Sequence, residues 1–268
     1  MPKILNLIIF ALISIATTAQ DIKKQNKIIT KAKMIGIGTN NNLDTYLSPL
    51  KYKGTSIKFI NYTTRENNKK IEHQIIISGD VSYTHNNAET NSRIGFNTTF
   101  QYNINKKFLS FANESNKIKF GVGILSNLGS LLSLRGGNNP AQLYADINIQ
   151  VGLIYEYLFK ISKQKLFLRY EVATPMCGIA FSPNYGQSYY EIFLKKDYDR
   201  NIIPTTFINS PSLKQMLTID IPIKNTILRI GYVGDYKQVQ VNKLKQYQYN
   251  NLLLLGLVMK FSINKLNL

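Results

Sequence analysis

The sequence predicts an all-β protein: an antiparallel transmembrane β-barrel of about ten strands, with long outer loops and short periplasmic turns. Three observations lead to this prediction. Apolar and polar residues alternate with a period of two, the links between alternating segments are short and long in turn, and the chain begins like an exported protein. No internal stretch approaches the about 20 apolar residues that a membrane-spanning helix needs.

The N-terminus has the parts of a secretory signal peptide. A short basic start is followed by the apolar residues 4–16 and then by small residues. We therefore expect residues 1–19 to be removed by cleavage after Ala19, which leaves residues 20–268 as a single barrel domain. A membrane anchor is the alternative, but the apolar run is short for a spanning helix and a polar residue interrupts it.

Ten segments are predicted to be strands, because only an extended strand places alternate residues on opposite faces. The first two segments alternate weakly. Alternation is clearest in the fourth, sixth and tenth: from Ala145 to Phe159, for example, the odd positions are apolar or aromatic and most even positions are polar or small. In chain order the segments are 31–39, 54–65, 71–84, 92–104, 117–125, 143–159, 165–177, 212–223, 226–236 and 250–263.

The links between these segments differ in length. Short polar links join the second segment to the third, the sixth to the seventh and the eighth to the ninth, and the link from the fourth to the fifth is moderately short. Barrels of the outer membrane have short periplasmic turns and longer extracellular loops, and an even strand number puts both chain ends on the periplasmic side. Eight or twelve strands remain alternatives to ten. The expected long loops are 40–53, 85–91, 126–142, 178–211 and 237–249.

A soluble β-sandwich also alternates, but its outer face would be charged. Aromatic residues near the strand ends favour the barrel, because aromatic girdles mark the two membrane interfaces. The last strand carries Gly256, Met259 and Phe261, similar to the terminal strand signal of outer-membrane barrels, although seven residues follow Phe261. The girdle candidates are Tyr83, Tyr102, Tyr157, Phe159, Tyr232, Tyr236, Tyr247 and Phe261.

Several segments resemble an uncharacterised family of Bacteroidetes outer-membrane β-barrel proteins. The resemblance covers most of the chain after residue 19 and is strongest between residues 175 and 263. It implies the fold and an outer-membrane location, with no activity to carry over. Lipopolysaccharide and phospholipid are then the expected lipid partners, and the barrel-assembly machinery is the expected partner during insertion. The matching segments are Asp44–Leu50, Phe181–Phe193, Ser210–Gln215, Asp220–Pro222, Leu228–Tyr232 and Asn242–Lys245.

The net charge is +18, from 33 Lys and Arg against 15 Asp and Glu. Nucleic acid is not the expected partner, because the lysines are scattered and accompany no nucleic-acid-binding motif. Many basic residues instead fall in the short turns, where they predict a basic ring that would attract anionic lipid. The alternative is that these turns are simply soluble. The ring comprises Arg65, Lys69, Lys70, Lys106, Lys107, Lys117, Lys160, Lys163, Lys165 and Lys224, opposed by Glu66 and Glu114.

No catalytic, cofactor-binding or metal-binding site is predicted. Cys177 is the single cysteine, which excludes an internal disulfide. It lies on the same face of its strand as Arg169 unless Pro175 breaks the register, and we expect its side chain to have a packing role. His73 is expected to face lipid. His85, at the outer end of its strand, is the one candidate base for a lipid hydrolase or transferase, although most exposed loop histidines have no catalytic role.

Charges of both signs are predicted on the lumen side of most strands. A ten-stranded barrel is only slightly wider than an eight-stranded one, which side chains fill, so a lumen closed by salt bridges is favoured over a pore. The expected function is a structural or binding scaffold whose outer loops contact an unidentified extracellular ligand. A narrow solute pore is the first alternative and a lipid-modifying enzyme the second. The predicted lumen charges are Glu72, Asp80, Arg93, Lys119, Asp146, Glu156, Arg169, Glu171, Asp220, Arg229 and Asp235.

Overall fold

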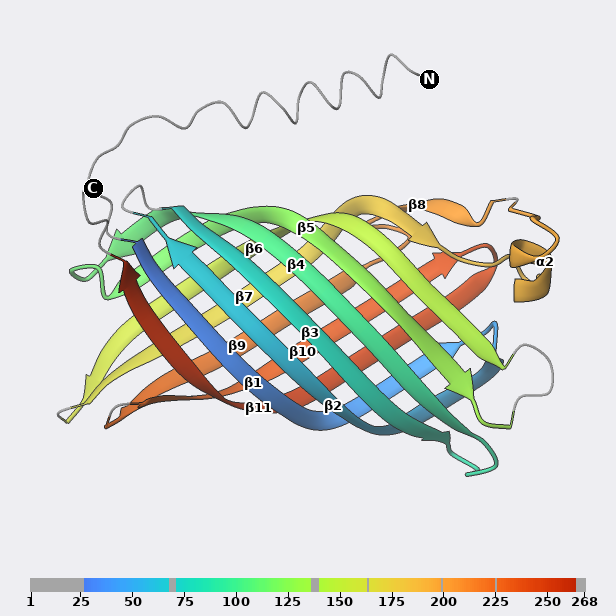
Figure 1. The fold of residues 1–268 in the computed structure, drawn as a ribbon, viewed down its shortest axis with the longest axis horizontal. Helices are drawn as coiled ribbons and strands as arrows, with labels where there is room; N and C mark the ends of the chain where they lie inside the picture. The colour runs from blue at the N-terminus through green and yellow to red at the C-terminus, as the bar shows by residue number, and fades with distance from the viewer. Residues whose placement is uncertain are drawn as a thin grey trace, which may run out of the picture.

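The computed structural model describes residues 27–67, 71–135, 140–162, 164–198, 200–224 and 226–263, so the predicted signal peptide lies outside the described residues. Antiparallel strands and one short helix make up this part of the chain (Figure 1). Their bounds are β1 (Lys27–Asp44), β2 (Ser48–Glu66), β3 (Ile71–Asn86), β4 (Ser92–Phe111), β5 (Asn116–Ser133), β6 (Ala141–Ile161), β7 (Gln164–Phe181), α2 (Tyr189–Phe193), β8 (Ile202–Thr206), β9 (Ser212–Ile223), β10 (Thr226–Val241) and β11 (Leu244–Ile263).

Ten of these strands close into a barrel. Each strand pairs with its neighbours in the chain, β7 pairs with β9, and β1 pairs with β11 over its whole length to complete the circle. The short β8 lies outside this circle, because it pairs only with the last five residues of β7, beyond the point where β9 leaves that strand. The prediction of an all-β, ten-stranded antiparallel barrel is therefore confirmed.

All ten predicted segments are strands, but most are longer than predicted and the outer loops are correspondingly shorter. The expected loop at 126–142 is mostly β5 and β6, and the expected loop at 237–249 is mostly β10 and β11. Alternation fades there because the outward positions near the strand ends become polar, as at Gln238, while the backbone ladder continues. The one long connection among the described residues runs from 182 to 211 and carries α2 and β8.

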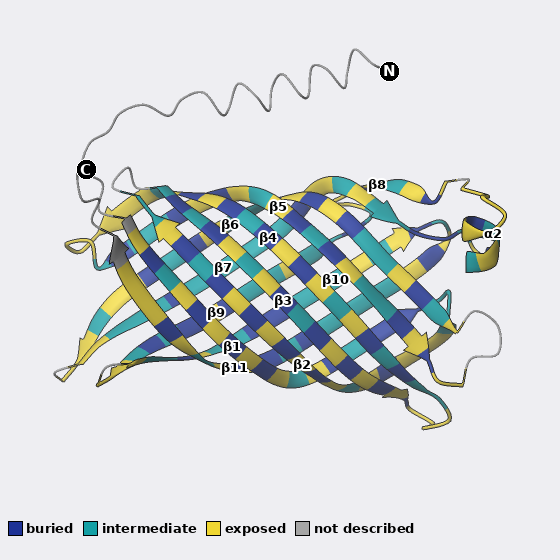
Figure 2. Ribbon diagram, viewed as in Figure 1, coloured by how far each residue is buried: buried dark blue, intermediate teal, exposed yellow. Residues whose placement is uncertain are grey.

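The outer face of the barrel is apolar. Along each strand exposed and buried residues alternate (Figure 2), and each of the ten barrel strands exposes at least one large apolar side chain. A soluble sandwich would bury these side chains, whereas a closed barrel can present them to lipid because no backbone edge is left unpaired. Examples in strand order are Ile35, Phe59, Ile77, Phe100, Ile124, Ile149, Ile179, Leu217, Ile230 and Leu255.

This outer face and the closed ladder place the protein in the outer membrane. No described helix is long and apolar enough to cross a membrane. We call the end of the barrel where β1 begins and β11 ends the terminal end, and the opposite end the loop end. All connections at the terminal end are short, as on the periplasmic side of barrels of this kind, whereas the long 182–211 connection lies at the loop end, where the β1–β2 and β10–β11 turns are also short.

The interior has one apolar wall and one polar wall. The apolar wall is a buried cluster contributed by β1, β2, β9, β10 and β11. The facing wall, from β3 to β7, carries mainly charged and amide side chains, and these form the candidate site. The apolar cluster comprises Ala32, Met34, Ile60, Tyr62, Met216, Val233, Leu252, Leu254 and Val258.

Candidate functional site

The eleven charges predicted for the lumen all point into it. Nine of them are at most 7% exposed, and the other two, Glu171 and Asp235, have side chains that are 12% and 14% exposed. Their even spacing along strands whose other face is apolar explains why alternation located them correctly. Ionised groups with so little solvent must be paired.

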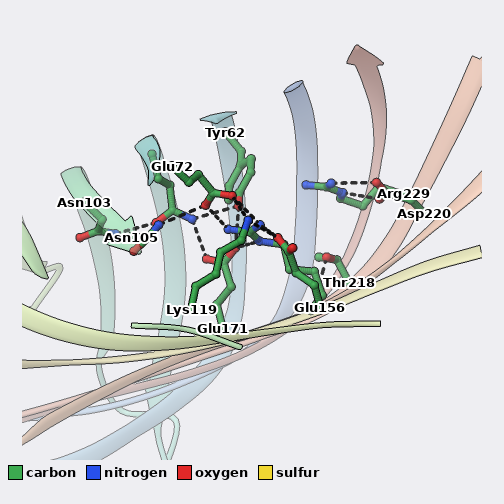
Figure 3. Close-up of polar contacts among 12 residues, drawn as sticks. Tyr62, Glu72, Asn103, Asn105, Lys119, Glu156, Glu171, Thr218, Asp220 and Arg229 are labelled. Carbon is green, nitrogen blue, oxygen red and sulfur yellow. Dashed lines mark hydrogen bonds and ion pairs between the residues drawn. The ribbon is translucent and has the colours of Figure 1, made fainter. Parts of the chain in front are cut away.

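An ion-pair layer crosses the polar wall near the terminal end; it consists of Glu72, Lys119, Glu156, Arg169 and Glu171 (Figure 3). The Lys119 Nζ atom lies 2.6 Å from Glu72 Oε2 and 2.9 Å from Glu156 Oε1. The Arg169 guanidinium lies 2.5 Å from Glu72 Oε1 and also pairs with Glu156 and Glu171. Two cations from β5 and β7 thus hold three carboxylates from β3, β6 and β7.

Tyr62 carries this layer across the lumen to β2. Its hydroxyl donates to Glu171 Oε1 at 2.6 Å and accepts a hydrogen bond from Gln74 Nε2 at 2.9 Å. The centre of its ring lies 5.8 Å from the guanidinium carbon of Arg169 and 5.3 Å from that of Arg229, within the range of cation–π attraction. The polar wall and the apolar wall therefore meet at one buried phenol.

Two further groups extend the layer on either side. Asp220 on β9 and Arg229 on β10 form a bidentate ion pair. The Arg229 Nε atom lies 2.6 Å from Asp220 Oδ1, and Nη2 lies 3.0 Å from Oδ2. On the polar wall a chain of amides continues the network, since Gln150 donates to Asn103 at 2.6 Å and Asn103 donates to Gln74 at 2.6 Å. Side chains from β2 to β7, β9 and β10 thus contribute polar groups to the lumen at this level.

A second crossing lies closer to the loop end. The Lys58 ammonium, from β2, lies 3.0 Å from Asp235 on β10 and 3.3 Å from Asp80 on β3. Lys237 on β10 pairs with Asp146 on β6. Sequence reasoning missed Lys58 because its strand also turns apolar residues such as Ile60 toward the lumen, and it missed Lys237 because the predicted segment ended at residue 236.

The mouth at the loop end is bridged as well. The Tyr144 hydroxyl, from β6, donates to Asp44 Oδ2 at 2.7 Å on β1. The Arg93 guanidinium lies over the Tyr52 ring, 3.7 Å from its centre, and both side chains are fully buried. The Tyr144–Asp44 contact joins opposite sides of the rim, whereas Arg93 and Tyr52 join β4 to β2 on one side.

The long 182–211 connection is docked against this rim. Tyr46, in the turn between β1 and β2, donates from its hydroxyl to the carbonyl oxygen of Gln187 at 2.9 Å. Tyr189 of α2 donates to Gln142 Oε1 at 2.8 Å and accepts from the backbone N–H of Leu143 at 2.7 Å. Burial, together with the carboxylates of Asp44 and Glu191, raises the pKa of Tyr46 to about 12, so the hydroxyl stays a donor at physiological pH.

A cavity lies between the mouth and the terminal half. Its volume is about 970 Å³ with its open side included, and its lining is mostly polar on the β5 and β6 side. Lys214 of β9 and Lys237 of β10 reach it from the opposite side. Among the described residues Lys214 makes no ion pair within 4.0 Å, which distinguishes it from Lys58 and Lys237.

The two histidines lie on the outer face. His73 faces outward, as expected, and its Nδ1 lies 2.9 Å from the Tyr102 hydroxyl. His85 is exposed near the loop end of β3, and no hydrogen bond or ion pair of its side chain occurs within the described ranges. The same ranges contain no group of three or more His, Cys, Asp or Glu residues that could hold a metal ion.

Cys177 does not keep the parity of Arg169. The pairing of β6 with β7 shifts between Ile149 and Gln150, so that Ile149 faces Cys177 and Gln150 faces Pro175. Met176 is the extra residue of this bulge, and Cys177 is turned to the outer face, where it is exposed. Cys177 therefore does not pack in the barrel interior, and the packing role expected from the sequence does not apply there.

The basic turns are only partly described. Lys69, Lys70 and Lys163 lie outside the described residues. Lys107 pairs with Glu114 at 2.7 Å, and Lys117 lies 4.0 Å from the same carboxylate. The remaining five residues are exposed near the terminal end: Arg65, Lys106, Lys160, Lys165 and Lys224. The basic ring remains a prediction.

Comparison with known proteins identifies a protein family and several solved outer-membrane structures with a similar fold. A comparison with curated proteins finds no significant match. The outer membrane protease OmpT from Escherichia coli is 9% identical over 92% of this chain and 99% of its own, with a TM-score of 0.44. The translocator domain of the autotransporter NalP from Neisseria meningitidis is 8% identical over 94% of each chain, with a TM-score of 0.38.

A third solved structure with a similar course of the chain is Neisserial surface protein A, which is 10% identical over 87% of this chain and 97% of its own, with a TM-score of 0.33. The family model described as "Protein of unknown function (DUF3316)" matches residues 5–267, nearly the whole sequence. The chain is thus an outer-membrane β-barrel and a member of the DUF3316 family.

Proposed function

We propose that this outer-membrane barrel is a structural and binding scaffold and not a channel, with its lumen closed at the terminal half and its ligand-facing surface at the loop end. The observation that carries the proposal is the ion-pair layer. Arg169, Lys119 and Glu72 are 4%, 1% and 2% exposed, although all three are charged. A solute pathway would leave such groups in contact with water.

The chemistry of the layer supports a permanent closure. Charges removed from water are stable only when partners satisfy them, and here each cation contacts at least two carboxylates. Glu171, the third carboxylate, is completed by the hydroxyl of Tyr62 and the amide of Gln74. Opening a path would separate several of these contacts together.

The loop end offers the surface for binding. The docked 182–211 connection exposes Tyr185, Tyr190 and Phe193, which are large side chains on a positioned loop. Loops held by a rigid scaffold are common positions for recognition. The cavity below them, with the ammonium of Lys214 in its wall, would suit a polar or anionic group of such a ligand.

Planar-bilayer recordings separate the scaffold from the narrow pore. The wild-type barrel is expected to insert without conductance steps. The neutral double variant Glu72→Ala/Arg169→Ala removes the centre of the layer and is expected to open stable steps, whereas Lys165→Ala, at an exposed position of β7, is expected to stay silent. Reproducible steps from the wild type would establish the pore and refute the scaffold.

A further inference from the structure

The apolar outer face is interrupted on β1 and β2. Lys31 and Lys33 occupy successive outward positions of β1, and their partners on β2 are Thr63 and Asn61. Arg65 is the next outward residue of β2 toward the terminal end. We call these five residues the β1–β2 notch; four of them are exposed and Thr63 is half-buried.

The notch lies at the depth of the apolar belt. On one side, Lys31 and Lys33 are paired with Met259 and Leu257 of β11, both about half exposed. On the other side, the β3 partners of Thr63 and Asn61 are apolar, namely Ile75 and Ile77. Phe261, a residue of the predicted terminal-end girdle, is paired with Ile29 and so lies nearer the end of the barrel than either lysine.

The cations of the notch lack an anion within the described chain. Lys31, Lys33 and Arg65 make no ion pair within 4.0 Å among the described residues. The described outward positions of β11, β1, β2 and β3 include no Asp or Glu. A lysine that faces hydrocarbon is unfavourable unless its ammonium reaches headgroups or another anion, which its long stem allows. No described outward residue of these strands supplies that anion, and the phosphate of a lipid headgroup would supply it.

A hollow continues from the notch toward the middle of the barrel. Its volume is about 660 Å³ with its open side included, and it is lined by Lys33 and Asn61 at one end and by Phe59, Ile77, Gly79 and Thr98 beyond them. Phe59 is paired with Ile35, one outward position farther from the terminal end than Lys33. Gly79 forms open floor, because a Cβ added there would meet no heavy atom closer than 3.9 Å.

The arrangement matches the polarity of one lipid. We propose that the notch binds an anionic glycerophospholipid of the periplasmic leaflet, with its phosphate held by Lys31, Lys33 and Arg65 and an acyl chain lying in the hollow. The cations lie toward the terminal end and the apolar hollow toward the middle of the membrane, which is the direction in which a lipid of that leaflet points. This inference is independent of whether the lumen is closed.

Native mass spectrometry of the full chain in detergent, with added phosphatidylglycerol or phosphatidylcholine, tests the charge. We expect the wild type to retain phosphatidylglycerol in preference to phosphatidylcholine, and Lys31→Gln/Lys33→Gln to weaken that binding about ten-fold or more. The matched control is Lys51→Gln/Lys53→Gln, which removes two exposed outward lysines near the loop end of β2 and should leave binding within about two-fold.

Gly79→Leu tests the hollow without changing charge. Because the added side chain meets open space at its Cβ, the barrel should fold, and circular dichroism with heat-dependent gel mobility checks this. Phosphatidylglycerol retention should fall several-fold. Equal retention by the wild type and the Lys31→Gln/Lys33→Gln variant would overturn the proposal. The proposal would also be overturned if the wild type showed a dimer mass that Lys31→Gln/Lys33→Gln abolished, because the notch would then be a protein–protein contact.

Discussion

A single guanidinium holds much of the terminal half together. Arg169 contacts Glu72, Glu156 and Glu171 from inside the lumen, and its own side chain is only 5% exposed. Pairs of this kind add little to stability when formed, because both partners lose water. Breaking one is costly, because the remaining charges stay buried without a partner.

The variant Arg169→Met, which keeps much of the side-chain volume, should therefore lower the free energy of unfolding by about 3–5 kcal/mol. Urea titration of the barrel in lipid vesicles measures this change. Lys165→Met, on the same strand but exposed, should be within about 0.5 kcal/mol of wild type. Equal stability of the two variants would show that water reaches the layer.

Tyr46 should titrate at unusually high pH. Its folded-state pKa of about 12 lies above the ordinary value of 10.0, because burial and the Asp44 and Glu191 carboxylates disfavour the phenolate. The contribution of Tyr46 to docking of the 182–211 connection is thus complete below pH 10 and is lost as the pH rises toward 12. In a spectrophotometric titration, Tyr46→Phe should lack one phenol ionising near pH 12. Loss of a phenol that ionises near pH 10 would contradict the buried contact.

Alternation predicted the lumen charges well wherever the opposite face of the strand was uniformly apolar. It missed Lys58 and Lys214, each of which has an apolar residue at the next lumen-facing position, Ile60 and Met216, although Asp220 on the same strand as Lys214 was predicted. It failed for Cys177 because a bulge reverses parity, and a bulge depends on pairing across two strands. A single sequence does not show which strand pairs with the bulged one, or in which register.

At the scale of elements, the ten barrel strands could be predicted and the long connection could not. β8 has five residues and exists only because β7 projects beyond β9 and offers it an edge. The helix α2 did leave a local signal: Ser188 and Glu191 form a capping box, in which each side chain accepts a hydrogen bond from the other residue's backbone N–H. That three-residue spacing from Ser to Glu was available in the sequence.

The depth of each strand in the membrane can be tested on β5. Ile124, in the middle of the strand, is half exposed on the outer face, and Leu132 has the same parity near the loop end. Ile124→Arg should lower the free energy of unfolding in bilayers by about 2–4 kcal/mol, and Leu132→Arg by about 0–1 kcal/mol. Equal costs, measured by urea titration in vesicles, would contradict the depth that we assign to β5.

At the scale of the whole molecule, the barrel reverses the usual distribution of polarity. All ten strands turn apolar side chains to the lipid-facing surface, which the β1–β2 notch interrupts, and the interior holds most of the paired charges. Length, composition and alternation sufficed to predict this plan. They left open whether the interior conducts, because closure depends on contacts between β2, β3, β5, β6 and β7 that lie far apart in the sequence.

Cysteine accessibility tests the closed lumen most directly. In a Cys177→Ser background, Gln150→Cys places a thiol at a lumen position that is 1% exposed, and Gln248→Cys places one in the wall of the cavity. A small, charged methanethiosulfonate reagent should modify Gln248→Cys in the folded barrel and leave Gln150→Cys unmodified until the barrel is unfolded. Modification of both thiols at similar rates in the folded barrel would contradict a closed terminal half.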